Sequence, residues 1–371
     1  MKIGILTYWW TDDNYGQLLQ AYALQTYLKK KGHDVFLIKY QEKKILKRKS
    51  FIERLSSITI KKIRKKIEYR KIRLNKKRHP RFFEDFKREY LVFSDEKYDS
   101  YFELQSSPPN ADLYICGSDQ VWNSKLRNPI EPYLLSFGNT NTKRASYAAS
   151  FGLVELSDAD KVVYNRCLAN FDAISVRERT GVNICNQLGY TDVYWLADPT
   201  LLLNINEWLA ISKKRITENE DKTNVFVYTL NETIEDKTKV IEYFKEKKNT
   251  VVNHVTANND ISGNIYPTIH EWITLINEAD FVITNSFHGM VFCIIFNKNF
   301  LVLPTTKSFI GMNDRVDSLL YKCDLKDHVL THFDEAKLEL FLNKEIDWKN
   351  INNNIKEWLK DSHAFFDNLL K

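Results

Sequence analysis

The first forty residues read as strand, helix, strand, and this order limits the fold more than any other feature. Lys2–Thr7 and Val35–Tyr40 are short apolar runs, and between them Gln17–Lys31 carries apolar residues at helical spacing. Gly32 ends the predicted helix. Two parallel strands joined by a crossover helix are the unit from which doubly wound α/β sheets are built.

Further short apolar runs, each followed by a turn or a helical pattern, continue this order along the chain. They are Asp112–Cys116, Ala145–Ser150, Ala173–Val176, Thr191–Trp195, Asn224–Tyr228, Thr250–His254, Phe281–Thr284 and Asn299–Leu303. A chain of 371 residues is long for one hydrophobic core. We therefore predict an α/β protein with two Rossmann-like domains, each with a parallel sheet. Residues 1–200 form the first and 201–350 the second, and an amphipathic helix over 351–371 returns to the first.

Several protein classes are disfavoured by what the sequence lacks. No apolar run reaches the roughly 20 residues that span a bilayer, and the opening MKIGILTYWW has too short an apolar core for a signal peptide. The five cysteines form no CxxC pair, so we expect a reducing cytoplasm and no metal site. GxSxG, GxxxxGK[ST], HExxH and a well-placed GxGxxG are missing, which argues against serine hydrolases, P-loop kinases, zincins and classical dehydrogenases.

The positive charge is concentrated in one segment. Residues 41–88 hold twenty Lys/Arg against five Asp/Glu in a chain of net charge +6, and apolar residues recur there at helical intervals. We expect one or two basic helices inserted into the first domain over 43–88. This surface fits a solvated charged face or a helix that binds anionic lipid. Nucleic acid is the less favoured partner, because no recognition motif accompanies the charge.

Small or polar residues follow the predicted strands, where open parallel sheets bind their ligands. His288 lies in the turn TNSFHG, at the start of a helix, and Arg177 directly follows a buried strand. Each also has a structural interpretation: His288 as a satisfied buried histidine, Arg177 as the partner of Glu178 or Asp172. Asn14 fits a helix cap or part of an anion cradle. The GSD turn at 117–119 fits either a helix cap or a polar ligand site.

Six segments, taken in order, resemble the polysaccharide pyruvyltransferase family. They are NYGQLLQAYAL at 14–24, LYICGSDQVWN at 113–123, SYAASFG at 146–152, SVRE at 175–178, ADPTLLL at 197–203 and TNSFHGMVFCIIFNKNFLVL at 284–303. The resemblance implies a GT-B-like fold and the transfer of pyruvate from phosphoenolpyruvate to two sugar hydroxyls of a capsular or exopolysaccharide precursor, as a ketal. It implies no essential cofactor, and His288 as the general acid/base.

The chain departs from the family at one position, because Ser286 stands where many relatives have an arginine. We therefore expect other groups to bind the donor, with Arg177 first. The donor set comprises Arg177, Ser286, Asn285, Gly289, Lys307 and Arg315. Asp119 is the second predicted catalytic residue and acts on an acceptor hydroxyl. The predicted cleft or acceptor residues are Asn14, Tyr15, Gly16, Gln20, Ser118, Gln120, Trp122, Asn123 and Ser150.

Two other functions remain open at this stage. One is a GT-B glycosyltransferase that uses a nucleotide sugar, because the fold would be the same. The other is a non-catalytic, membrane-associated component of polysaccharide assembly. If the acceptor is linked to polyprenyl diphosphate, the basic helices would hold a cytoplasmic enzyme at the inner face of the membrane.

Overall fold

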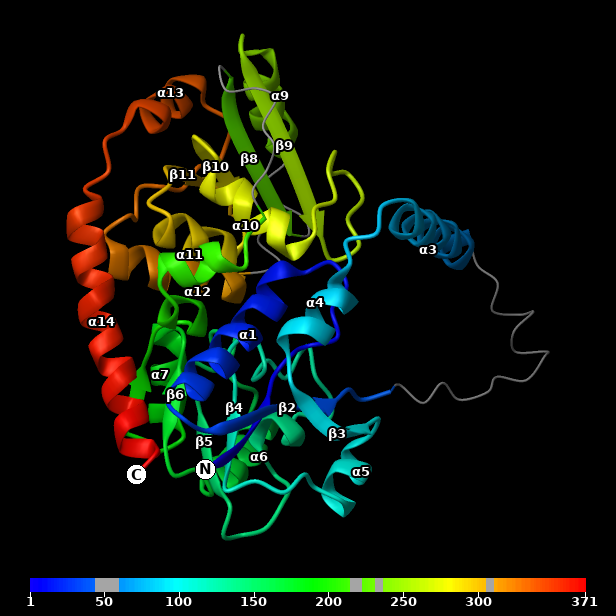
Figure 1. Cartoon of the computed structure of the whole chain (residues 1–371), viewed down its shortest axis with the longest axis vertical. Coiled ribbons are helices and arrows are strands. Elements are labelled where there is room, and N and C mark those ends of the chain that lie inside the picture. Colours follow the sequence, from blue (N-terminus) through cyan, green and yellow to red (C-terminus); the bar gives the residue numbers. More distant parts are fainter. Residues whose placement is uncertain (44–59, 214–221, 231–235, 305–309) are drawn as a thin grey trace.

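The computed structural model describes residues 1–43, 60–213, 222–230, 236–304 and 310–371, and these build two Rossmann-like α/β domains (Figure 1). Each domain has its own parallel sheet. The strands are short and mostly buried, as expected for parallel sheets covered by helices on both faces. The α/β class and the two parallel sheets predicted from the sequence are therefore confirmed.

The first sheet has the strand order β3-β2-β1-β4-β5. Its strands are β1 (Lys2–Leu6), β2 (Asp34–Tyr40), β3 (Phe93–Tyr98), β4 (Leu113–Cys116) and β5 (Lys143–Ser146). Beyond β5, the pair β6 (Ile174–Val176) and β7 (Val193–Trp195) continues in parallel through bridges such as Ala149 to Val176. The switch point beside β1 opens toward the carboxyl ends of β1 and β4, the usual ligand position in such sheets.

The helices and 3-10 turns of this part of the chain connect these strands. They are α1 (Tyr15–Lys30), α3 (Ile60–Arg78), α4 (Phe83–Tyr90), α5 (Tyr101–Ser106), η1 (Glu131–Leu134), α6 (Asp158–Leu168), α7 (Arg179–Gln187) and η2 (Pro199–Leu202). Asn14 caps α1 by accepting a hydrogen bond from the Gln17 amide, as its capping interpretation predicted. The basic insertion is helical over α3 and α4, whereas its residues 44–59 lie outside the described part of the chain.

The second sheet has the order β11-β10-β8-β9. Its strands are β8 (Thr223–Leu230), β9 (Thr250–Ala257), β10 (Phe281–Thr284) and β11 (Phe300–Val302). The helices are α8 (Ile205–Ala210), α9 (Lys237–Glu246), α10 (Ile269–Asn277), α11 (Phe287–Ile295), α12 (Ile310–Cys323) and α13 (Glu335–Asn343).

The last helix, α14 (Trp348–Leu369), runs along the flank of the molecule and ends beside the first domain (Figure 1). Phe366 stacks on Tyr147 at a centroid distance of 4.5 Å. The Trp358 indole donates to the carbonyl of Trp195 at 2.9 Å. These contacts place the amphipathic tail against the first domain.

Two differences from the predicted strands have local causes. The run Ala145–Ser150 stops being a strand at Ser146, because Ala148 has φ of 49° in the left-handed region, which interrupts an extended chain. The edge strand β3 was missed because its sequence, FSDEKY, alternates no apolar residues and is largely exposed.

A continuous apolar core joins the two domains at the start of α1. The ring of Tyr15 stacks on Trp272 at 5.2 Å, and its hydroxyl donates to the carbonyl of Pro267 at 2.6 Å. Trp208 lies edge-on to Phe292 of α11 in the same cluster. The first turn of α1 is thereby fixed beside the first turn of α11, where His288 lies.

Candidate active site

The carboxyl ends of four strands bring their polar residues together between the domains. Ser118 and Asp119 follow β4, Arg177 follows β6, Asp198 follows β7, and His288 follows β10. Each of these side chains is at most a tenth exposed. This cluster is the candidate active site.

Asp198 is the hub of the cluster, with no exposed surface. Its Oδ2 accepts hydrogen bonds from Ser118 Oγ at 2.8 Å and from Arg177 Nη1 at 3.0 Å. Its Oδ1 accepts from the amide and the hydroxyl of Thr200 at 3.0 and 2.7 Å. Both oxygens are thus used, and the carboxylate is held in one orientation.

Burial alone would raise the pKa of Asp198, because a charged carboxylate loses its hydration there. His288 and Arg177, together with the hydrogen bonds to the carboxylate, outweigh this effect and hold the pKa of Asp198 well below its usual range. Asp198 is therefore ionised at neutral pH, and its charge can stabilise a proton on His288.

His288 is held between Asp198 and the start of α1. Its Nε2 lies 3.5 Å from Asp198 Oδ2 and has no hydrogen-bond partner. On its other side, a Cβ atom on Gly16 would lie 2.2 Å from His288 Nδ1, closer than side chains can approach. Gly16 is therefore the residue of the NYG motif that lets the imidazole lie against the first domain.

Arg177 is 1% exposed, and its planar group lies over the ring of Phe287 at 4.4 Å. Its Nη1 pairs with Asp198, and its Nη2 lies 3.8 Å from Asp119 Oδ1. The sequence suggested Glu178 or Asp172 as its structural partner. Instead Glu178 accepts hydrogen bonds from the amides of 151 and 152, and Asp172 accepts one from the amide of residue 144.

A second arginine, Arg315 of α12, lies near Arg177 and is 7% exposed. Burial, followed by repulsion from Arg177, lowers the pKa of Arg315 to about 10, although Asp119, Glu178 and Asp314 oppose this shift. Arg177 Nε and Nη2 and Arg315 Nε are buried without hydrogen-bond partners. Two close guanidinium groups with unused N–H donors form a local site for an anion.

The other predicted donor residues shape the turn around His288. Ser286 caps α11 by accepting from the Gly289 amide at 3.2 Å. Asn285 bonds to both the amide and the carbonyl of Leu230, which ties β10 to the end of β8. A Cβ on Gly289 would lie 2.5 Å from Thr284 Oγ1. Lys307 lies outside the described residues.

The predicted residues around Asp119 form a compact turn. Asp119 has φ of 78°, and its Oδ1 accepts from the Gln120 amide. Gln120 Oε1 accepts from Asn123 Nδ2 at 3.2 Å, and the Trp122 indole donates to the carbonyl of residue 133 inside the first-domain core. The Ser150 hydroxyl is buried beside the Glu178 carboxylate; burial raises the pKa of Glu178, and hydrogen bonding with Ser150 lowers it. Asp119 therefore keeps hydrogen-bonding capacity for a ligand, whereas Ser150 supports Glu178 and Trp122 packs in the core.

The predicted cleft residues after β1 also divide into a core residue and residues that hydrogen-bond around the site. Tyr15 belongs to the interdomain core described above. Asn14 Nδ2 donates to Asn258 Oδ1 of the second domain at 3.2 Å. Gln20 donates to Thr7 Oγ1 at 2.9 Å, and Thr7 donates to the carbonyl of Ser118. Asn14 and Gln20 thus support the cluster from one side.

Comparison with known proteins identifies the family. A family model described as polysaccharide pyruvyl transferase matches residues 14–307. The chain belongs to the polysaccharide pyruvyl transferase family. No curated protein sequence matches it.

Solved structures similar to this pyruvyl transferase family member show its fold. MnaA from S. aureus, solved with UDP, has 10% sequence identity and a TM-score of 0.50, and the match covers 96% of this chain and 91% of that chain. A putative UDP-N-acetylglucosamine 2-epimerase from Listeria monocytogenes has 8% identity and a TM-score of 0.47, with the same two coverages. The likeness to MnaA agrees with the GT-B-like arrangement of two Rossmann-like domains.

Asp198 is the site residue that sequence reasoning missed in this family member. It lies in the segment ADPTLLL, which reads as a domain crossover, and no predicted site residue came from it. The available signal was its position, since Asp198 follows β7 as Arg177 follows β6. Its role depends on contacts with Ser118, Arg177 and His288, which lie far from it in the sequence.

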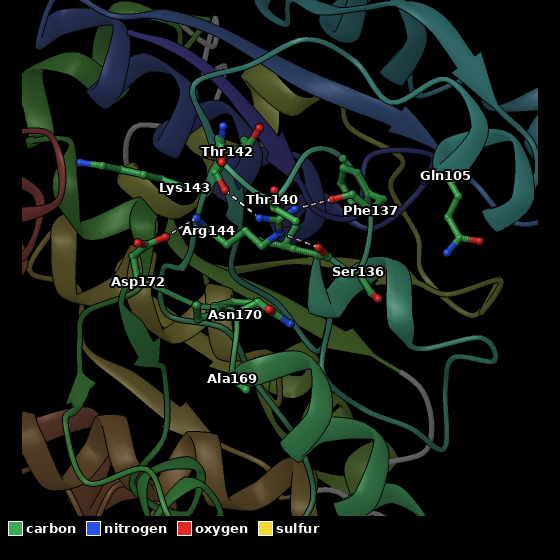
Figure 2. Close-up of a pocket in the computed structure, with 14 residues that line it drawn as sticks. Gln105, Ser136, Phe137, Thr140, Thr142, Lys143, Arg144, Ala169, Asn170 and Asp172 are labelled. Atoms are coloured by element: carbon green, nitrogen blue, oxygen red, sulfur yellow. Dashed lines mark hydrogen bonds between the residues drawn. The ribbon is translucent and has the colours of Figure 1, made fainter.

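A cavity of about 580 Å³ lies away from this centre, at the amino end of β5 (Figure 2). Arg144 lines this cavity, and its main-chain amide donates a hydrogen bond to Asp172. The Arg144 guanidinium donates to four carbonyls, those of residues 135, 137, 139 and 142. These hydrogen bonds hold the loop 135–142 in place. The cavity lies at the amino ends of the strands, whereas His288 lies at the carboxyl ends.

Proposed function

We propose that this chain transfers a pyruvyl group from phosphoenolpyruvate to two hydroxyls of a sugar, forming a ketal on a capsular or exopolysaccharide precursor. The observation that carries the proposal is the pair of buried arginines, Arg177 and Arg315, which have N–H groups without hydrogen-bond partners. Arg177 shares the carboxylate of Asp198 with His288. Phosphoenolpyruvate carries a carboxylate and a phosphate on the same carbon, C2, and two guanidinium groups match two neighbouring anions.

Arg315 takes the place of the arginine that many relatives have at position 286. Ser286 caps α11 and has no charge to offer the donor. Arg315 comes from the neighbouring helix α12 and supplies a second cation next to Arg177. An anion bound between the two arginines would relieve their mutual repulsion, in addition to the carboxylates of Asp119, Glu178 and Asp314 that already act on Arg315.

In the proposed reaction His288 protonates C3 of the donor, which makes C2 electrophilic. One sugar hydroxyl attacks C2 and loses its proton, phosphate leaves, and a second hydroxyl closes the ketal. Of the two hydroxyl protons, one replaces the proton that His288 gave to C3, and the other leaves with phosphate. Asp198 stabilises the protonated imidazole, and Asp119 accepts or orients an acceptor hydroxyl.

The test is to incubate the chain with phosphoenolpyruvate and candidate sugar acceptors, measuring phosphate release and the mass of the acceptor. We expect phosphate release matched by a pyruvyl mass gain. Release of nucleotide from a nucleotide sugar would show a glycosyltransferase instead. Neither release, with acceptors that a related pyruvyl transferase uses, would favour a non-catalytic role.

A further inference from the structure

The helix α3 stands out from the body of the molecule (Figure 1). Its described side chains from Arg64 to Arg78 include nine Lys/Arg and one acidic residue, Glu68. Of these nine, only Lys76 forms an ion pair with another described residue. Because these basic side chains form so few ion pairs within the described part of the chain, their charge is available to an external partner.

Among the described side chains of α3, those of its last turn make the polar contacts with the body. Asn75 donates to the Tyr266 hydroxyl at 2.9 Å, and Lys76 pairs with Asp12 at 2.7 Å. Just after the helix, His79 stacks on Tyr266 at 4.5 Å. Asp12 lies in the loop that leads to Gly16, so the helix is anchored close to the active-site seam.

The outer face of α3 combines apolar and basic side chains. Ile67, Arg70, Lys71 and Leu74 follow the i, i+3, i+4, i+7 spacing that puts residues on one face of a helix. All four are exposed, with Ile67 at 52% and Leu74 at 45%. The half-buried Ile72, Asn75 and Lys76 lie on the side toward the body. We define Ile67, Arg70, Lys71 and Leu74 as the outer face.

We propose that the outer face of α3 docks this protein on an anionic phospholipid surface. The surplus of unpaired positive charge complements anionic headgroups, and Ile67 and Leu74 can enter the boundary between headgroups and acyl chains. The convex, exposed rod of α3 suits a flat surface. Charge alone would also attract nucleic acid, but the two exposed apolar residues on the same face have no use against a phosphate backbone. Within the described part of the chain, none of the helices has the length and apolar character needed to span a bilayer.

The experiment measures co-sedimentation of the full chain with phosphatidylcholine vesicles that contain phosphatidylglycerol, and with vesicles of phosphatidylcholine alone. We expect binding to the anionic vesicles only. Each basic residue near such a surface strengthens binding by about fivefold, so the double change Arg70→Glu/Lys71→Glu should weaken it by at least about 25-fold. Lys349→Glu/Lys356→Glu, the same charge change at exposed positions of α14, is the matched control and should change binding far less.

A second variant tests the contribution of the two apolar residues of the outer face. Ile67→Ser/Leu74→Ser should leave binding at low salt but make it more salt-sensitive than in the unchanged protein. Circular dichroism should show that all these surface variants fold normally. No binding of the unchanged chain to anionic vesicles at low salt would overturn the proposal. So would tighter binding to a duplex oligonucleotide that the Ile67→Ser/Leu74→Ser change does not affect, which would assign α3 to nucleic acid.

Discussion

Arg177 and Arg315 are buried between the domains, whereas Arg70 and Lys71 of α3 project into solvent. Arg177 is enclosed by Asp198, Asp119 and the ring of Phe287. Arg70 and Lys71 have no ion pair with any described residue. Both regions contain basic side chains, but those of the buried arginines are held in place, whereas those of Arg70 and Lys71 keep their rotamer freedom.

This difference decides what each group of cations can recognise. A buried guanidinium held by carboxylates has one orientation, so its remaining N–H groups select an anion of matching geometry. Exposed basic side chains keep their rotamer freedom and are screened by salt, so they attract any anionic surface without selecting its shape. We therefore assign donor recognition to the interdomain seam and surface attachment to α3.

The largest expected effect comes from replacing His288, the proposed acid/base. His288→Ala should lower the rate of ketal formation by about 100- to 10,000-fold, because it removes the acid/base that protonates the donor. The measurement is the initial rate of phosphate release with saturating donor. Near-normal activity in a variant with an unchanged circular dichroism spectrum would remove His288 from the reaction.

Asp198→Asn tests whether the charge of Asp198 stabilises the buried cluster around Arg177. Removing the charge of one partner in a buried ion pair should lower the free energy of unfolding by about 3 kcal/mol at neutral pH. Because the folded pKa of Asp198 is depressed, its stabilisation is present above the unfolded pKa of about 3.9 and is lost progressively as pH falls from there through the folded pKa. Urea unfolding measured between about pH 3 and pH 7 should therefore show the difference between the two proteins narrowing in acid. A constant difference at all pH values would contradict this role.

Gly16→Ala tests how tightly the imidazole is held. The new Cβ would overlap His288 Nδ1, so the ring must move, and a displacement of this kind costs about 100-fold in rate. Gly32→Ala is the control: its Cβ would meet no atom within 4 Å, but φ of 86° makes the change strained. We expect Gly32→Ala to lose stability and keep its rate. Equal rate losses in both variants would mean that Gly16 matters only for folding.

Arg177→Lys tests whether donor binding needs the guanidinium geometry of a buried arginine and not its charge alone. Lysine keeps the charge near Asp198 but cannot present two parallel N–H groups to an anion, so the KM for phosphoenolpyruvate should rise by about tenfold. The same substitution at Arg70 of α3 should leave this KM unchanged. A normal KM in Arg177→Lys would place the donor elsewhere.

The sequence predicted the scaffold better than the connections within the site. The helix Gln17–Lys31 and the strand Phe281–Thr284 follow from periodicity and turn residues, and both are present with small shifts at their ends. That Ser118, Arg177 and His288 follow strands was also visible in the sequence. The ion pair of Arg177 with Asp198 and the contact between Gly16 and His288 were not, because both depend on how separate strands and domains pack.

Arg315→Met tests whether the two buried, mutually repelling arginines form the donor site. The folded protein disfavours the charge on Arg315, because its pKa falls to about 10. Methionine removes this charge and fills only the inner part of the space that the arginine occupies, and circular dichroism should show that the variant folds. Calorimetric titration with phosphoenolpyruvate should show binding to the unchanged protein and at least about tenfold weaker binding to Arg315→Met. Equal affinity in both proteins, with the variant folded, would contradict the account.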